Sequence, residues 1–332
     1  MAVNTRARIA TVCQAGHFFP TVDENRRHVF GLLDLALGLK PDLVCLPETF
    51  TIPSVPRQSI EEVAEEFPGP TVEAAAARAK QHRCYIVCPV VTRREGRCWN
   101  SAVVLGRAGE VVGIYDKIHP VTSTPDYTSL EQGITPGREP VVFELDFGPV
   151  GIQICFDILF RETWAELARR GARLILWPSA YNGGFPLQAY AWMHHVYVIS
   201  SVNSDSARII DPCGRVLAQT DRYSNVIYRD INLDFAVCHY DLNLSMPELI
   251  MQAYPGKVEM RSHADDAQVL VEPLDPELTI ARMQDELGFI TTQEYEAIHR
   301  QAYQTLWAGR TLQPRPARHG NRPIHQKWLD TG

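Results

Sequence analysis

The sequence predicts an α/β protein in which two mixed sheets carry helices on their outer faces. Short apolar runs typical of buried strands alternate with segments of helical periodicity. The order of elements also repeats, because each half of the first 240 residues reads as a βαβ unit with hairpins. We expect one domain over residues 1–240 and a C-terminal extension over residues 241–332, which packs on this body or on a partner subunit.

The first βαβ unit places an acid at a strand end. Residues 8–15 read as a buried strand, and a helix follows from Thr21 or Asp23, either of which can cap it. Residues 43–46 form a second short strand, which ends at Glu48. Because α/β folds gather chemistry at the carboxyl ends of strands, Glu48 is a candidate site residue. A solvated glutamate in a turn is the alternative interpretation.

The rest of the first half leads to a lysine and a long loop. The elements expected there are a helix over residues 71–82, a strand over 84–92 and a hairpin of residues 99–106 and 110–115. The hairpin runs into Lys117, which on its own would be interpreted as a snorkelling surface residue. Residues 120–140 lack periodicity and contain Glu131. Loops over strand ends often hold binding residues.

The second half presents a cysteine between a strand and a helix. Residues 141–145 and 150–155 form an expected hairpin that ends at Cys155, and a helix follows over 161–170. A position near a helix N-terminus lowers a thiol pKa and supplies N–H donors for an oxyanion. A small buried core residue is the alternative for Cys155. The remaining expected elements are strands at 173–177, 196–202, 207–211, 215–219 and 223–233, and helices at 187–194, 276–287 and 292–307.

Composition excludes several classes of partner. The net charge is -7 without a block of lysine or arginine, so we expect no nucleic-acid partner and no binding to an anionic membrane. No apolar run reaches the length of a membrane span, and the N-terminus lacks the apolar region of a signal peptide. The 8 cysteines form no CxxC pair, which favours reduced thiols over disulfides or a zinc site. We therefore expect a cytoplasmic protein.

With Glu48, Lys117 and Cys155 in view, the chain resembles the nitrilase superfamily of carbon–nitrogen hydrolases. The matching stretches, in order, are residues 46–49, 100–119, 131–137, 151–157 and 177–180. The resemblance implies an α-β-β-α sandwich, a homodimer or higher homo-oligomer, no metal and no cofactor. It also implies a Glu48–Lys117–Cys155 triad, with Glu131 as a second glutamate that orients the lysine and the substrate.

The resemblance assigns a role to each member of the triad. Cys155 attacks the carbon of a small amide or N-carbamoyl compound, and Glu48 serves as general base and then general acid. Lys117 and a backbone N–H stabilise the oxyanion, and water hydrolyses the resulting thioester. The substrate contacts that we expect are Phe156, Ser179, Ala180 and Tyr181.

Residues near Cys155 separate the branches of this family. Phe156 and Asp157 favour amidases and carbamoylases, whereas true nitrilases resemble Cys-Trp-Glu at this point. Leu159 stands where carbamoyl-amino-acid hydrolases carry an arginine for the substrate carboxylate, and Arg161 stands in the place of a proline. Amide or carbamoyl hydrolysis is the leading hypothesis. Transfer of the acyl group to an amine, a true nitrilase activity and a scaffold without catalysis are the alternatives.

Overall fold

The computed structural model describes residues 5–53, 58–314 and 319. The chain divides into two compact units, of which the larger is Arg6–Ile231 and the smaller is Asn232–Gly332 together with the N-terminal residues up to Thr5. None of the described helices has the length and apolar character needed to span a bilayer.

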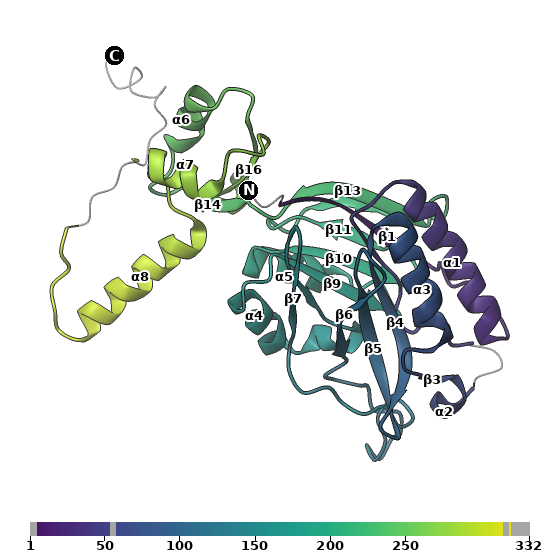
Figure 1. Cartoon of the computed structure of the whole chain (residues 1–332). Helices are drawn as coiled ribbons and strands as arrows, with labels where there is room; N and C mark the ends of the chain where they lie inside the picture. The colour runs from purple at the N-terminus through teal and green to yellow at the C-terminus, as the bar shows by residue number, and fades with distance from the viewer. Residues whose placement is uncertain (1–4, 54–57, 315–318, 320–332) are drawn as a thin grey trace. The chain divides into compact units, whose positions relative to one another are not determined.

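The first sheet of the larger unit has the strand order β13-β1-β2-β4-β5-β6 in the described part of the chain, with β3 paired to β4. The strands β1, β2 and β4 run parallel, whereas β4, β5 and β6 are antiparallel. Helices α1 and α3 cover one face of this sheet (Figure 1). The bounds are β1 (Arg6–Val12), α1 (Val22–Gly38), β2 (Leu43–Cys45), α2 (Ile60–Val63), β3 (Glu65–Glu66), α3 (Gly69–His82), β4 (Tyr85–Arg94), β5 (Arg97–Leu105), β6 (Val111–Asp116) and β13 (Val226–Asn232).

The core under these helices follows from their apolar spacing. Val29 and Leu33 of α1 and Val72 and Ala75 of α3 are buried in one cluster with residues of β1, β2 and β4. The side chain of Thr21 accepts a hydrogen bond from the Glu24 backbone, which caps α1 as the sequence predicts.

The second sheet has the strand order β12-β11-β10-β9-β8-β7 among the described residues. Its central strands β8, β9 and β10 are parallel, and the outer pairs are antiparallel. The helices α4 and α5 pack on one face around Trp164, Trp177 and Tyr190. The bounds are β7 (Val142–Leu145), β8 (Gly148–Ile152), the 3-10 helix η1 (Cys155–Leu159), α4 (Arg161–Arg169), β9 (Leu174–Ser179), α5 (Phe185–His194), β10 (Tyr197–Val202), β11 (Arg208–Ile210) and β12 (Val216–Gln219).

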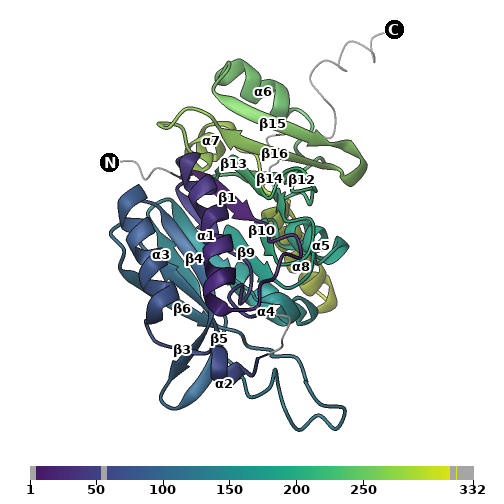
Figure 2. The same cartoon turned by 90° about the vertical axis from the view of Figure 1, so that its right-hand side faces the viewer.

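The two sheets face each other through β1 and β10. Thr11 donates its hydroxyl hydrogen bond to the Ser200 carbonyl at 2.7 Å, and Ser201 donates to the Val12 carbonyl at 2.8 Å. Every residue of β9 and β10 is buried, as expected of strands covered on both faces. The layers therefore run helices, sheet, sheet, helices (Figures 1 and 2), and the predicted α-β-β-α sandwich is confirmed.

The smaller unit carries a sheet that the sequence analysis did not predict. Its strands pair in the order β14-β16-β15, and its cluster of buried side chains includes Met246, Ile250, Val271 and Met283. The strand β15 was missed because it is mostly polar and only partly buried, so it lacks an apolar run. The bounds are β14 (Ala236–His239), α6 (Met246–Ala253), β15 (Val258–His263), the 3-10 helix η2 (Ala264–Asp266), β16 (Gln268–Pro273), α7 (Ile280–Leu287) and α8 (Thr292–Trp307).

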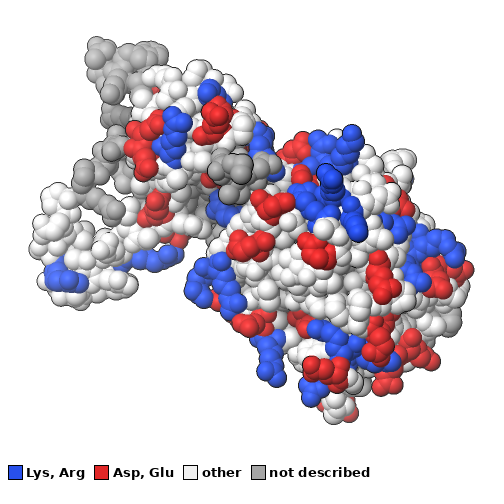
Figure 3. Space-filling model, in the orientation of Figure 1, with Lys and Arg blue, Asp and Glu red and all other residues white. Residues whose placement is uncertain are grey.

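Acidic and basic side chains of the larger unit lie close together and form ion pairs. Figure 3 shows basic and acidic residues of that unit together on the visible face. Arg107, for example, forms ion pairs with both Asp42 and Asp146. Such exposed pairs contribute little stability, about 0–1 kcal/mol each.

Candidate active site

Four residues singled out in the sequence line one cavity of about 240 Å³ in the larger unit. Glu48 lies beyond the end of β2, Lys117 directly follows β6, Glu131 comes from the loop after it, and Cys155 opens η1 beyond β8. Glu48 and Lys117 follow the ends of strands in the first sheet, with Glu131 in the loop beyond, and Cys155 follows the end of a strand in the second sheet. The sandwich therefore brings together side chains that are far apart in the sequence.

Lys117 is the centre of the polar contacts in this cavity. Only 1% of the residue is exposed, and its Nζ lies 2.9 Å from Glu48 Oε1 and pairs with Glu131 Oε1. Burial works to lower the pKa of Lys117, but the carboxylates of Glu48 and Glu131 outweigh it, so the pKa is raised. The ammonium group therefore keeps its charge at neutral pH.

Asn100 of β5 joins the two carboxylates from the other side. Its Nδ2 donates to Glu48 Oε1 at 2.9 Å and to Glu131 Oε2 at 3.2 Å. Asn203, just after β10, donates to the Glu48 carbonyl at 2.8 Å and so holds its backbone. Neither residue was predicted to belong to the site from the sequence. Asn100 opens one of the stretches that match the family and is an amide in an apolar strand, but neither signal identifies its partners.

The Cys155 backbone is held in an unusual conformation. Its φ of 46° lies in the left-handed region, which costs a residue with a side chain about 1–2 kcal/mol. The carbonyls of this turn accept hydrogen bonds from aromatic side chains: Cys155 from Trp177 at 3.1 Å, Asp157 from Trp164 at 3.1 Å and Ile158 from Tyr190 at 2.6 Å. Backbone strain of this kind persists where surrounding contacts over-determine it, and it is frequent at active sites.

Burial raises the pKa of the Cys155 thiol to about 12, and the neighbouring Glu48 adds to the effect. Lys117 and hydrogen bonds from Ser179 and the Ala180 backbone act in the opposite direction without compensating. The expectation of a lowered thiol pKa is therefore wrong. The physical reason is that Cys155 is only 8% exposed, so loss of hydration outweighs the favourable charges. The thiol needs a base to become a nucleophile.

Glu48, which lines the same cavity, is the candidate for that base. Its Oε1 accepts the bonds from Lys117 and Asn100, which leaves Oε2 without a hydrogen bond among the described residues. Glu48 also lies close enough to influence the ionisation of Cys155. A carboxylate with one oxygen bonded and the other without a hydrogen bond can accept a proton.

The four predicted substrate contacts lie in different surroundings. Ala180 lines the cavity, and Ser179 lies close enough to Cys155 to act on its pKa. Phe156 packs edge-on against Phe160 with ring centroids 5.8 Å apart, and the partly exposed Tyr181 packs edge-on against Trp177 at 5.4 Å. Contact between the substrate and any of these side chains stays a prediction.

Aliphatic side chains form most of the remaining cavity wall. The described ones are Ile52, Ile60, Val91, Val121 and Ile134. Lys117 is the only basic side chain that lines this cavity within the described ranges. Thr49 and Glu131, which also line it, both have a φ of 39°, so two further residues of the wall adopt the left-handed region.

Comparison with known proteins identifies the family of the chain. Residues 9–237 match the sequence model of the carbon–nitrogen hydrolase family, so the chain belongs to that family and to the nitrilase superfamily. It is an enzyme of C–N bond hydrolysis.

Several proteins with similar sequences are named as amidases. The chain is 27% identical to omega-amidase NIT2 of Xenopus tropicalis, over 65% of this chain and 86% of the relative. It is 27% identical to deaminated glutathione amidase of Synechocystis, over 65% and 88%. Among solved structures, Nit3 of Saccharomyces cerevisiae has a TM-score of 0.60 at 20% identity, covering 77% of this chain and 97% of that one. An amidase from Nesterenkonia has a TM-score of 0.57 at 20% identity, covering 68% and 90%. These structural matches establish the fold.

The raised pKa of Cys155 predicts a thiol that stays protonated in the resting enzyme. We expect the thiolate absorbance of the wild type, minus that of Cys155→Ala, to stay near zero from about pH 6 to pH 9 and to rise only above that range. In Glu48→Gln the rise should move to lower pH, because a neighbouring negative charge is lost. A thiolate already formed at neutral pH would contradict this account.

Proposed function

We propose that this enzyme hydrolyses the C–N bond of small carboxamides through a thioester on Cys155. The observation that carries the proposal is the buried Lys117, bonded to Glu48 and Glu131 beside a cysteine in a strained turn. The amidase names of the relatives support the amide as the substrate class. The aliphatic wall supports a small and largely apolar acyl group.

Acylation begins with proton transfer. Glu48 takes the thiol proton as the Cys155 sulfur attacks the amide carbon, and the carbonyl oxygen becomes an oxyanion. The Lys117 ammonium, held by two carboxylates, stabilises that oxyanion without reorganising. Glu48 then gives its proton to the leaving nitrogen, so ammonia or an amine departs and a thioester remains.

Deacylation repeats these steps with water. Glu48 removes a proton from a water molecule, whose oxygen attacks the thioester carbon, and Lys117 again stabilises the oxyanion. The C–S bond breaks, the carboxylic acid leaves, and the proton held by Glu48 returns to the Cys155 sulfur. Glu131 orients Lys117 through their ion pair and receives support from the Val121 backbone N–H at 3.0 Å.

The cysteines support a reducing compartment, and we propose that the enzyme is cytoplasmic. All eight are buried, and none is paired in a disulfide. Unoxidised cysteines in this number are typical of proteins that fold in reducing surroundings. The proposed partner is a small-molecule amide, with no nucleic acid and no membrane.

We further propose that helix α8 contributes to a homo-oligomeric interface. The apolar residues Leu278, Ile280, Met283 and Phe289 are buried within the smaller unit itself. In contrast, Tyr303, Leu306 and Trp307 of α8 are exposed, with Trp307 at 82%. Grouped exposed aromatic and aliphatic side chains are typical of contact surfaces.

The interface proposal predicts that charge on α8 weakens assembly. The double variant Leu306→Asp and Trp307→Asp should lower the mass measured by light scattering, because charged side chains do not tolerate burial at an interface. Leu35→Asp on α1, another exposed leucine, is the matched control and should leave the mass unchanged. An unaltered mass in the double variant would exclude α8 from the interface.

Cys155→Ala should abolish ammonia release while leaving the protein folded, because alanine fills nearly the same space and lacks a nucleophile. Cys98→Ala is the matched control, since Cys98 is also 8% exposed and lies on β5. It should keep most of the turnover. Residual activity above a few per cent in Cys155→Ala would rule out the thioester route.

We expect variants of the polar residues in the cavity to lose kcat to different degrees. Lys117→Ala and Glu48→Gln should each reduce kcat by about 10²–10³-fold or more, because each removes a preorganised group that acts in the transition state. Glu131→Ala should cost less, because Glu131 acts through Lys117. Circular dichroism would verify the fold of each variant. A near-normal kcat in Lys117→Ala would remove the oxyanion role.

A further inference from the structure

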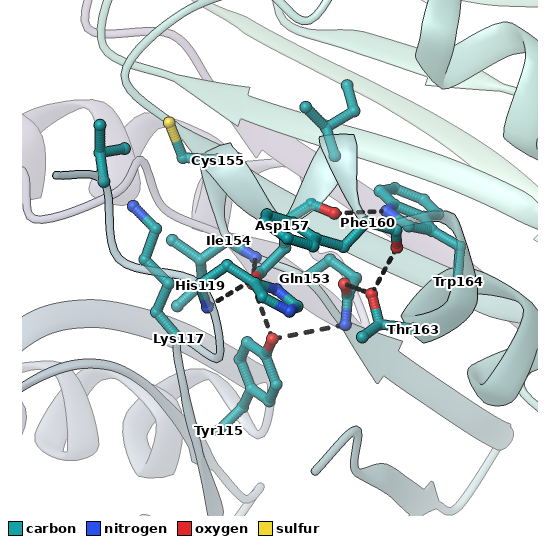
Figure 4. Close-up of polar contacts among 12 residues, drawn as sticks. Tyr115, Lys117, His119, Gln153, Ile154, Cys155, Asp157, Phe160, Thr163 and Trp164 are labelled. Carbon is teal, nitrogen blue, oxygen red and sulfur yellow. Dashed lines mark hydrogen bonds and ion pairs between the residues drawn. The ribbon is translucent and has the colours of Figure 1, made fainter. Parts of the chain in front are cut away.

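Asp157 is a fully buried carboxylate two residues after Cys155 that the steps above do not use. It accepts four hydrogen bonds in the described structure (Figure 4). Its Oδ1 accepts from the His119 backbone N–H at 3.0 Å and from His119 Nδ1 at 2.7 Å. Its Oδ2 accepts from the Tyr115 hydroxyl at 2.7 Å and from the Ile154 backbone N–H at 2.8 Å.

The donors come from both sheets and flank the reacting groups. Tyr115 and His119 lie on either side of Lys117, at the end of β6 in the first sheet. Ile154 directly precedes Cys155, beyond β8 in the second sheet. A single carboxylate therefore fixes the backbone that carries the lysine and the backbone that carries the thiol. Figure 4 shows Asp157 between these two segments.

Further contacts make this link rigid. The His119 ring stacks on Phe160, the residue after η1, with centroids 3.5 Å apart and an interplanar angle of 4°. The Tyr115 hydroxyl also accepts a hydrogen bond from Gln153 at 3.4 Å, and Gln153 in turn accepts from Thr163 of α4 at 2.7 Å. Burial and the charge of Asp157 raise the pKa of Tyr115, so its hydroxyl stays protonated and donates.

Asp157 is not suited to take part in the chemistry itself. It is 0% exposed, both of its oxygens are occupied, and it does not line the described cavity. Its effect must therefore pass through the groups that it holds. Stabilisation of an oxyanion depends on donors placed to within a fraction of an ångström, and a misplacement of about 1 Å can cost about 10²-fold in rate.

We propose that Asp157 is a positioning residue that sets the spacing between Lys117 and Cys155 by binding the ends of β6 and β8 at once. This inference rests on the proposed roles of Lys117 and Cys155. Because hydrogen bonds to a carboxylate are stronger than neutral ones, a charged group holds this junction better than an amide of the same shape.

The variant Asp157→Asn tests this role with almost no change in shape. An asparagine accepts on one oxygen only, so its NH2 group must face either the Ile154 or the His119 backbone N–H, and one of these loses its acceptor. We expect kcat to fall about 100-fold, because the spacing between Lys117 and Cys155 changes. We expect KM to change less than about threefold, because the aliphatic side chains of the cavity wall are unaltered. Asp146→Asn, which removes an exposed charge paired with Arg107, is the matched control.

Two milder variants keep the test decisive if Asp157→Asn folds poorly. Tyr115→Phe removes one bond to Asp157, and His119→Asn removes the Nδ1 bond and the ring stack. Each should lower kcat about 3–10-fold with KM nearly constant, and each leaves the Ile154 bond intact. A kcat within twofold of wild type in Asp157→Asn, or in both milder variants, would overturn the proposal.

The outcome separates this inference from the proposed function. If Cys155→Ala is inactive but Asp157→Asn turns over normally, the positioning role fails and the thioester route stands. If Cys155→Ala remains active, the route itself fails. A parallel rise of KM and loss of kcat in Asp157→Asn would indicate a general disturbance of the cavity and would also count against positioning.

Discussion

The buried ammonium of Lys117 is the constraint on which the rest of the site depends. An isolated charge in such surroundings costs several kcal/mol, and only well-placed partners offset that cost. Here Glu48 and Glu131 supply them, and Asn100 joins the two carboxylates. The ends of β2 and β6 and the loop after β6 must therefore meet at one point. Because β2 and β6 point in the same direction within the first sheet, their carboxyl ends lie at the same end of that sheet.

The second sheet adds a thiol that its surroundings keep protonated. Burial raises the pKa of Cys155 to about 12, so the sulfur is inert until a base acts on it. In the mechanism that we propose, Glu48 removes the thiol proton only as the sulfur attacks a bound substrate, and Lys117 stabilises the resulting oxyanion. The strained Cys155 turn is held by indole and phenol donors on one side and by Asp157 on the other.

The sequence predicted the layers of the larger unit and placed Glu48, Lys117 and Cys155 at strand ends. Both predictions were possible because the periodicity of apolar residues and the end of a strand can be read from neighbouring residues alone. The sequence did not predict the direction of the Cys155 pKa shift, which depends on burial by residues distant in the chain. It also assigned no role to Asn100, Asn203 or Asp157, each of which has hydrogen-bond partners between 31 and 155 residues away. In the sheet of the smaller unit, β15 escaped prediction because it is largely polar, whereas β14 and β16 are short buried runs that were not assigned as strands.

The thioester on Cys155 is the central claim, and trapping it is the most direct test. An activated ester of a small acyl group should acylate the enzyme faster than water removes the acyl group, so an intermediate accumulates. Acid quench and peptide mass spectrometry should then find the acyl group on the peptide that contains Cys155, and neutral hydroxylamine should release it. Turnover without any adduct, or an adduct on another cysteine, would contradict the account.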